Sequence, residues 1–252
     1  MRIGILTAGG DCPGLNAVIR AAGRKLLREG HEPVGLMRGY RGLAYREHKV
    51  LDHGSLSGLL PLGGTVLSTS SYDPFRHDDG PDLVRAAIER GDVDAVIAIG
   101  GEHTMEVTHN LYQAFGLPVV GVPKTIDNDI VGTVNCFGFD TAVSFASDAI
   151  DRLHSTAAAH RRIMVVEVMG RYAGWIALHA GVSGGADIIL IPEIPYDIEK
   201  VAAAVRRRDQ FGARFTIVVV AEGAKPIGGQ TTVMTQAHGQ YVERLGGVGH
   251  KL

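Results

Sequence analysis

The chain has few cysteines and little net charge. Its 252 residues include two cysteines, Cys12 and Cys136, which are far apart and lack the spacing of a zinc site or a redox pair. We interpret both as free thiols in a reducing compartment and expect a cytoplasmic protein. A formal net charge of −2 gives no general attraction to nucleic acid or to an anionic membrane surface, so any anion binding must be local.

Long apolar runs are also absent. No stretch approaches the length of a membrane span, and the apolar N-terminus, residues 1–7, is too short for the hydrophobic region of a signal sequence. Hydrophobic residues still make up 45% of the chain and 34 residues are glycine, which argues against disorder. The length permits one large or two moderate domains.

Apolar runs of strand length alternate with segments of helical periodicity, which predicts an α/β fold with parallel strands. No linker interrupts this alternation, and we place a domain boundary near residue 135. The expected strands are 2–7, 32–37, 93–99, 117–122, 162–168, 187–191 and 215–221. The expected helices are 15–28, 81–90, 174–182 and 197–208, together with a helix that 136–140 leads into and that ends near residue 158.

Three glycine-led loops, Ala8–Gly14, Gly63–Tyr72 and Gly100–Thr104, follow expected strands or the segments after them. Each alone can be an ordinary turn, and the first matches neither the dinucleotide fingerprint nor the P-loop pattern. Parallel strands with helical crossovers bring their C-terminal loops to one edge of the sheet. Together the loops therefore favour a site where backbone N–H groups bind phosphate.

The segment Pro123–Asp129 follows the apolar strand expected at 117–122 and ends in Lys, Thr and two carboxylates. Such a loop contains the groups that phosphoryl transfer needs. Asp127 can take a proton from a hydroxyl, Asp129 can hold that base or a metal ion, and Lys124 can contact phosphate oxygens. The alternative is a turn rich in Asp and Asn, which form turns and cap helices.

Two further groups of polar residues have competing interpretations. Glu102, His103, Glu106 and His109 have near-helical spacing but no recognised zinc signature, so a solvated helix face competes with a metal site. Arg161, Arg162, Arg171 and Lys225 lie at the ends of later elements, where arginine suits bidentate phosphate binding. Arg161 and Arg162 also fit a solvated strand entry, whereas Arg171 lies between two glycine-flanked turns.

The runs Gly9–Arg20, Pro123–Asp129, Gly138–Ala142 and Val165–Arg171 together resemble the 6-phosphofructokinase family, in unbroken order from residue 1 to about 224. The chain is most similar to the actinobacterial type, which includes ATP- and pyrophosphate-dependent members. The resemblance implies two Rossmann-like parallel-sheet domains with helices on both faces and the C-terminal part of the family fold missing. Residues 1–135 would bind the phosphoryl donor and 136–252 the sugar phosphate.

The resemblance also implies roles for individual residues in converting fructose 6-phosphate to fructose 1,6-bisphosphate. Asp127 matches the base that deprotonates the C1 hydroxyl, Thr125 a transition-state contact, and Asp129 the second carboxylate of the loop. Arg171 matches the arginine that neutralises the transferring group. Arg162, Met169, Gly170 and Glu222 match family residues that contact the sugar phosphate. The residue at the position of Arg162 usually reaches a neighbouring subunit in this family.

On the donor side, the resemblance implies ATP or pyrophosphate together with Mg²⁺, which would be mostly hydrated and associated with Glu102. It further implies a glycolytic, cytoplasmic enzyme that forms a homotetramer, with no nucleic acid or membrane partner. The residues that match the donor site are Gly10, Gly101, Glu102, His103, Thr104 and Lys124.

Three departures from the family pattern bear on activity. His103 stands where ATP users have glycine and pyrophosphate users have aspartate, so the donor stays open. Ser71 replaces an arginine that contacts the donor, although Arg76 is nearby. After 246–252, which resembles a helix start, the family continues into a strand and a Gly-His-Ile-Gln-Arg-Gly-Gly segment. A catalytically silent, truncated phosphate- or nucleotide-binding paralogue is therefore the alternative.

Overall fold

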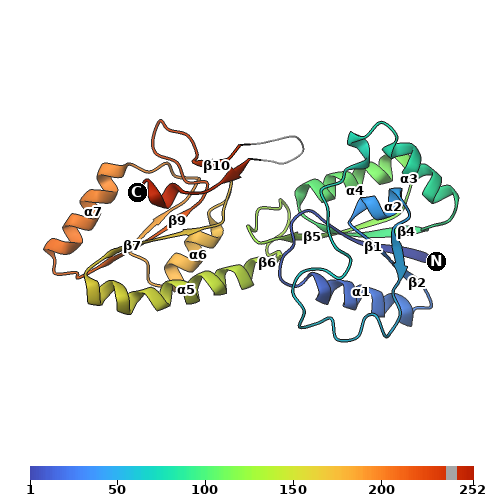
Figure 1. The fold of residues 1–252 in the computed structure, drawn as a ribbon, viewed down its shortest axis with the longest axis horizontal. Helices are drawn as coiled ribbons and strands as arrows, with labels where there is room; N and C mark the ends of the chain where they lie inside the picture. The colour runs from blue at the N-terminus through green and yellow to red at the C-terminus, as the bar shows by residue number, and fades with distance from the viewer. Residues whose placement is uncertain (237–242) are drawn as a thin grey trace. The chain divides into compact units, whose positions relative to one another are not determined.

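The computed structural model describes residues 1–236 and 243–252. They form two compact units, each with helices and a parallel sheet (Figure 1), which confirms the predicted α/β class. The first unit is Met1–Thr125 with Ile130–Gly138, and the second is Ile126–Asp129 with Phe139–Leu252. The assignment of donor binding to residues 1–135 and of sugar-phosphate binding to residues 136–252 stays a prediction.

The first unit contains a six-stranded sheet in the order β3-β2-β1-β4-β5-β6. Only β3 runs antiparallel to its neighbour. After β1 the chain passes to β2 on one side and later returns to β4 on the other, so the strand order reverses between β1 and β4. Ligands bind at such switch points, beyond the carboxyl ends of the strands. The strands are β1 (Arg2–Ala8), β2 (Glu32–Leu36), β3 (His48–Val50), β4 (Ala95–Gly100), β5 (Val119–Thr125) and β6 (Phe137–Gly138).

Helices cover both faces of this sheet (Figure 1). Side chains alternate between the faces along β1, so Leu6 and Ala8 join a buried cluster with Tyr40 and Val84, while Ile5 points to the opposite face. Helix α1 (Leu15–Arg28) covers the face of Ile5. The cluster face is covered by α2 (Tyr40–Ala44), the 3₁₀ turn η1 (Pro74–Arg76), α3 (Gly80–Glu89) and α4 (Glu102–Phe115).

The second unit is built on three parallel strands in the order β7-β9-β8. Every residue of the central strand is buried, with alternate side chains on opposite faces. Ile217 and Val219 pack against α5 and α6, while Val218 and Val220 pack with Val201 of α7. The elements are β7 (Ile163–Val168), β8 (Ile188–Leu190), β9 (Thr216–Ala221), α5 (Phe139–His160), α6 (Trp175–Ser183) and α7 (Ile198–Gln210).

An antiparallel pair, β10 (Val233–Thr235) and β11 (Arg244–Leu245), follows β9. The Glu167 carboxylate at the end of β7 accepts hydrogen bonds from the backbone N–H groups of Gly247 (2.7 Å) and Gly249 (2.9 Å). These bonds attach the last residues to β7. The helix start expected at 246–252 is instead a 3₁₀ turn, η2 (Val248–His250).

Two segments expected to be loops belong to regular elements. Strand β5 extends to Thr125, because Pro123 pairs with Gly100 of β4 and the next two residues pair with β6. Lys124 and Thr125 are therefore strand residues. Helix α4 begins at Glu102, so Glu102, His103 and Thr104 form its first turn and not a loop. The short elements α2, β3, β6, β10 and β11 were not predicted.

Candidate active site

A cavity of about 230 Å³ lies beyond the carboxyl ends of β1 and β4, at the switch point of the first sheet. The pairing of Ala8 with Gly100 brings the two glycine loops side by side there. All six predicted donor-binding residues line this cavity: Gly10, Gly101, Glu102, His103, Thr104 and Lys124. The remaining lining residues are Ala8, Gly9, Tyr40, Ser70, Ser71, Tyr72 and Val107.

Small residues allow the first turn of α4 to approach β1. A side chain at Gly100 would overlap the Thr104 side chain, whose hydroxyl donates to the Ala8 carbonyl at 3.4 Å. The Tyr40 hydroxyl lies 2.7 Å from the Thr104 carbonyl and fixes the helix from the other side. Helix α4 thus begins at the cavity wall, where its free N–H groups can bind phosphate oxygens.

Lys124 supplies a positive charge to this cavity. Its side chain is buried, and its ammonium donates to the Gly10 carbonyl. Cys12 lies close by, and its burial raises the pKa of its thiol to about 11 although Lys124 opposes that rise. The thiol is therefore protonated at neutral pH, and Lys124 is the group that can meet an anion.

The His103 ring lies between two carboxylates. Its Nε2 atom is 3.3 Å from Asp73 Oδ2, and its Nδ1 atom is 3.2 Å from Glu106 Oε2. Ser71 lines the cavity, whereas Arg76 does not and instead pairs with Asp73 at 3.3 Å. In this structure Arg76 therefore does not take the place of the family's arginine at position 71.

A second cavity, of about 510 Å³, lies at the carboxyl ends of β7 and β9 in the second unit. Among the predicted substrate residues it is lined by Met169, Arg171 and Glu222. Gly170 turns the chain between two of them with a φ of 146°, a conformation that favours glycine. The other lining residues are Glu167, Val168, Met234, Glu243, Arg244, Leu245 and Gly246.

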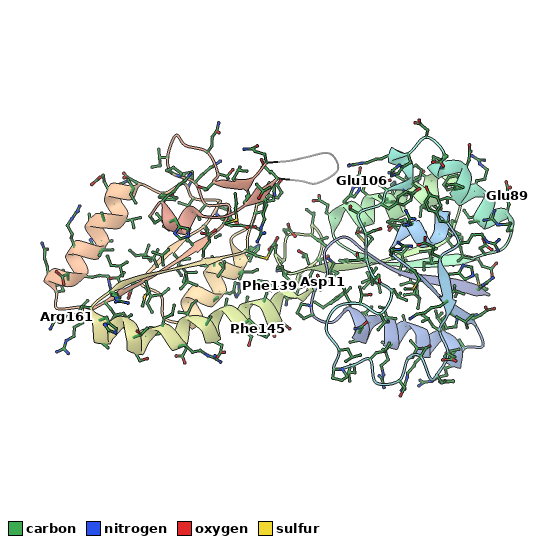
Figure 2. The ribbon with its side chains drawn as sticks, in the orientation of Figure 1. Asp11, Glu89, Glu106, Phe139, Phe145 and Arg161 are labelled. Atoms are coloured by element: carbon green, nitrogen blue, oxygen red, sulfur yellow. The ribbon has the colours of Figure 1, made fainter. Side chains whose placement is uncertain are left out.

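Arg162 is not part of this cavity. It lies at the opposite end of β7, where it lines a separate cavity of about 240 Å³ with Arg161, Arg206 and Arg214. Figure 2 labels Arg161 at the turn from α5 into β7. Within the second unit, the structure therefore does not bring Arg162 together with Met169, Arg171 and Glu222.

Glu243 engages both terminal nitrogens of Arg171. Arg171 Nη1 donates to the Glu243 carbonyl at 2.8 Å, and Nη2 donates to the Glu243 carboxylate at 3.0 Å. The Arg171 guanidinium also lies over the Tyr172 ring, 5.4 Å from its centroid. Sequence reasoning missed Glu243 and Arg244, because they lie more than seventy residues from Arg171 in a segment without a recognisable motif.

The predicted catalytic loop follows β5. Thr125 ends the strand and pairs with Gly138 of β6. Asn128 has a φ of 53°, a left-handed conformation that asparagine tolerates well, and makes a tight turn between Asp127 and Asp129. Asp127 is half-buried and Asp129 is exposed. The catalytic roles of Thr125, Asp127 and Asp129 stay predictions.

Among residues 1–236 and 243–252, no group of three or more His, Cys, Asp or Glu side chains could hold a metal ion. Glu102, His103, Glu106 and His109 therefore do not form a metal cluster here. Glu102 is an exposed carboxylate at the donor cavity, which fits a hydrated Mg²⁺ that shares its ligands with phosphate. Over the same residues, the helices are too short or too polar to span a membrane.

Comparison with known proteins identifies the family. A model described as Phosphofructokinase matches residues 2–249. The chain is 53% identical, over 99% of its length, to an ATP-dependent 6-phosphofructokinase from Chloroflexus aurantiacus. It is 50% identical, over its whole length, to a pyrophosphate–fructose 6-phosphate 1-phosphotransferase from Streptomyces coelicolor. It spans 70% of the first relative and 74% of the second.

Solved structures agree with this result. Phosphofructokinase from Saccharomyces cerevisiae superposes with a TM-score of 0.80 at 30% identity, over 89% of this chain and 34% of the yeast chain. The match of the family model over nearly all of the chain, together with relatives at 50% identity or more, is decisive. The chain belongs to the phosphofructokinase family, a family of phosphotransferases.

Proposed function

We propose that this chain transfers a phosphoryl group from a polyphosphate donor to the C1 hydroxyl of fructose 6-phosphate. The observation that carries the proposal is the donor cavity, which gathers all six residues predicted for that site. Met169, Arg171 and Glu222 line a second cavity, which supports binding of the sugar phosphate. The names of the Chloroflexus and Streptomyces relatives support the same reaction.

In the proposed reaction, Asp127 accepts the proton of the C1 hydroxyl while the C1 hydroxyl oxygen bonds to the terminal phosphorus of the donor. The bond from that phosphorus to the bridging oxygen breaks, and the remainder of the donor leaves with the bonding electrons. Lys124 and the N-terminus of α4 stabilise charge on the donor, and Arg171 neutralises the transferring group. Mg²⁺, held by Glu102 and the phosphates, would supply further positive charge when bound.

We propose pyrophosphate as the donor. The cavity of about 230 Å³ is smaller than the range of about 300–1,000 Å³ typical of drug-sized ligands, and it suits a compact dianion or trianion better than a nucleotide. The His103 ring and the Val107 side chain both occupy its wall. ATP is the second candidate, which the names of several relatives favour.

We also propose that the protein is cytoplasmic and forms a homo-oligomer, which in this family is a tetramer. Arg162 lies outside the substrate cavity of its own unit, which supports the view that it serves the site of a second copy. An exposed arginine pair at a strand entry would otherwise have no role in sugar-phosphate binding. Light scattering of the purified chain, with and without fructose 6-phosphate, measures the assembly.

A coupled assay of the purified protein with fructose 6-phosphate, Mg²⁺ and either pyrophosphate or ATP tests the reaction. We expect fructose 1,6-bisphosphate to form, with kcat/KM for pyrophosphate at least about tenfold above that for ATP, a difference of about 1.4 kcal/mol. Absence of product with both donors, while calorimetry detects binding of fructose 6-phosphate and a donor, would favour the catalytically silent alternative.

Substituting Gly10→Ala is expected to raise the KM for the donor about tenfold, because the added methyl group would enter the donor cavity, at a cost of about 1.4 kcal/mol. A Cβ atom at Gly10 meets nothing within 4 Å, so the fold should not change. Gly63→Ala is the control, since its Cβ also meets nothing within 4 Å and lies outside the cavity. Equal KM values for the two variants would contradict a donor site at Gly10.

Substituting Glu243→Gln is expected to lower the KM for fructose 6-phosphate roughly two- to fivefold, the range of a partly exposed ion pair. Glutamine keeps the backbone contact to Arg171 but removes the charge that competes with the substrate phosphate. Glu199→Gln is the control, because Glu199 is exposed and its pair with Arg206 is long, at 3.9 Å. An unchanged or higher KM would show that Glu243 does not compete for Arg171.

A further inference from the structure

Asp73 is a buried carboxylate beside the donor cavity that the proposed reaction does not use. Its side chain is 8% exposed. Oδ1 accepts a hydrogen bond from the backbone N–H of Phe75 at 2.9 Å and caps the 3₁₀ turn η1. Oδ2 lies 3.3 Å from Nε2 of His103 and also 3.3 Å from Nε of Arg76. One oxygen is therefore committed to the backbone, and the other is shared between Arg76 and His103 of α4.

The His103 side chain is 45% exposed and lies on the first turn of α4. The ring contacts two carboxylates, Asp73 from the segment before η1 and Glu106 from α4. Glu102 and Lys124 line the same cavity as His103, and Arg76 pairs with Asp73. Glu106, labelled in Figure 2, is 68% exposed. Asp73 is the buried and anchored contact.

We propose that Asp73 is a positioning residue that sets the donor preference of this chain by fixing the His103 ring in the donor cavity. The inference rests on the proposed function, because it concerns the choice between a diphosphate and a nucleoside triphosphate. A fixed ring restricts the cavity that His103 lines.

The substitution Asp73→Asn tests this inference. The asparagine carbonyl still accepts from the N–H of Phe75, so the cap of η1 remains, while the charge facing His103 is removed. Calorimetry gives the Kd values for Mg-pyrophosphate and Mg-ATP, and the coupled assay gives kcat/KM for each. We expect the ratio of pyrophosphate to ATP affinity to fall at least about tenfold relative to the unmodified chain.

Three further variants separate positioning from general stability. His103→Gly should shift the ratio in the same direction, and adding Asp73→Asn to His103→Gly should change it by less than twofold. Arg76→Gln tests the other partner of Asp73, which lies 3.3 Å away. Asp79→Asn is a matched control, because this exposed residue precedes α3 without a side-chain cap.

Two results would overturn the inference: an Asp73→Asn ratio within twofold of the unmodified chain, or independent effects of Asp73→Asn and His103→Gly. Equal weakening of both donors with a lower Tm would mean a structural role only, and would also overturn it. Failure of the proposed function looks different, since binding ratios would shift while no variant forms fructose 1,6-bisphosphate.

Discussion

Replacing Asp127 with asparagine is expected to lower kcat for the phosphorylation of fructose 6-phosphate by about 10²- to 10⁴-fold, the range that general-base catalysis contributes. The KM for fructose 6-phosphate should change by less than about threefold, because an amide keeps the size and one accepting oxygen of the carboxylate. Such a separation of kcat from KM is the result expected for a base that acts only on the reacting hydroxyl.

The control for this substitution is Asp151→Asn, which removes the charge of an exposed carboxylate in α5 of the same unit. It should leave kcat and Tm unchanged. A kcat for Asp127→Asn within about fivefold of the unmodified chain would contradict the role of Asp127 as the base. A parallel collapse of Tm would instead assign a structural role to the loop.

Substituting Arg171→Ala is expected to lower kcat by about 10³-fold, the lower end of the effect of removing an arginine from a phosphoryl-transfer site. Arg171→Lys should restore little of this loss, because an ammonium lacks the planar pair of terminal nitrogens, both of which donate to Glu243 in this structure. Stopped-flow or coupled measurements at saturating donor and sugar phosphate give kcat directly.

Arg207→Gln serves as the matched control, because Arg207 is an exposed residue of α7 that lines neither the second cavity nor the cavity at Arg162. Its kcat should equal that of the unmodified chain. Full activity of Arg171→Lys would show that a single positive charge is enough to neutralise the transferring phosphoryl group. It would contradict the proposal that Arg171 acts through two N–H donors.

Regular elements were predictable where periodicity was strong. The helix expected at 15–28 is α1 (Leu15–Arg28), because its apolar positions face the sheet at helical spacing and Gly14 precedes it. The strand expected at 117–122 is displaced to Val119–Thr125, because its end depends on hydrogen bonds to β4 and β6. A local pattern contains no information about such distant partners.

The same distinction applies to the site. The glycine loops of the donor site could be predicted because they follow parallel strands, and topology brings such loops to one edge. The individual donor residues, among them Lys124 within β5, were implied by the resemblance to the family. Asp73 and Glu243 could not, because they reach His103 and Arg171 from segments with no recognisable motif. The position of Arg162 at the far end of β7 follows directly from the direction of that strand.

The most direct test of the central claim is a crystal structure of the protein with fructose 6-phosphate and a non-reactive donor analogue. The measured quantity is the distance from the Asp127 carboxylate to the C1 hydroxyl oxygen. We predict a distance of about 2.6–3.2 Å, within reach for proton transfer, with the analogue in the cavity that Gly10 and Lys124 line. A C1 hydroxyl bonded to another residue, with Asp127 turned to solvent, would contradict the account.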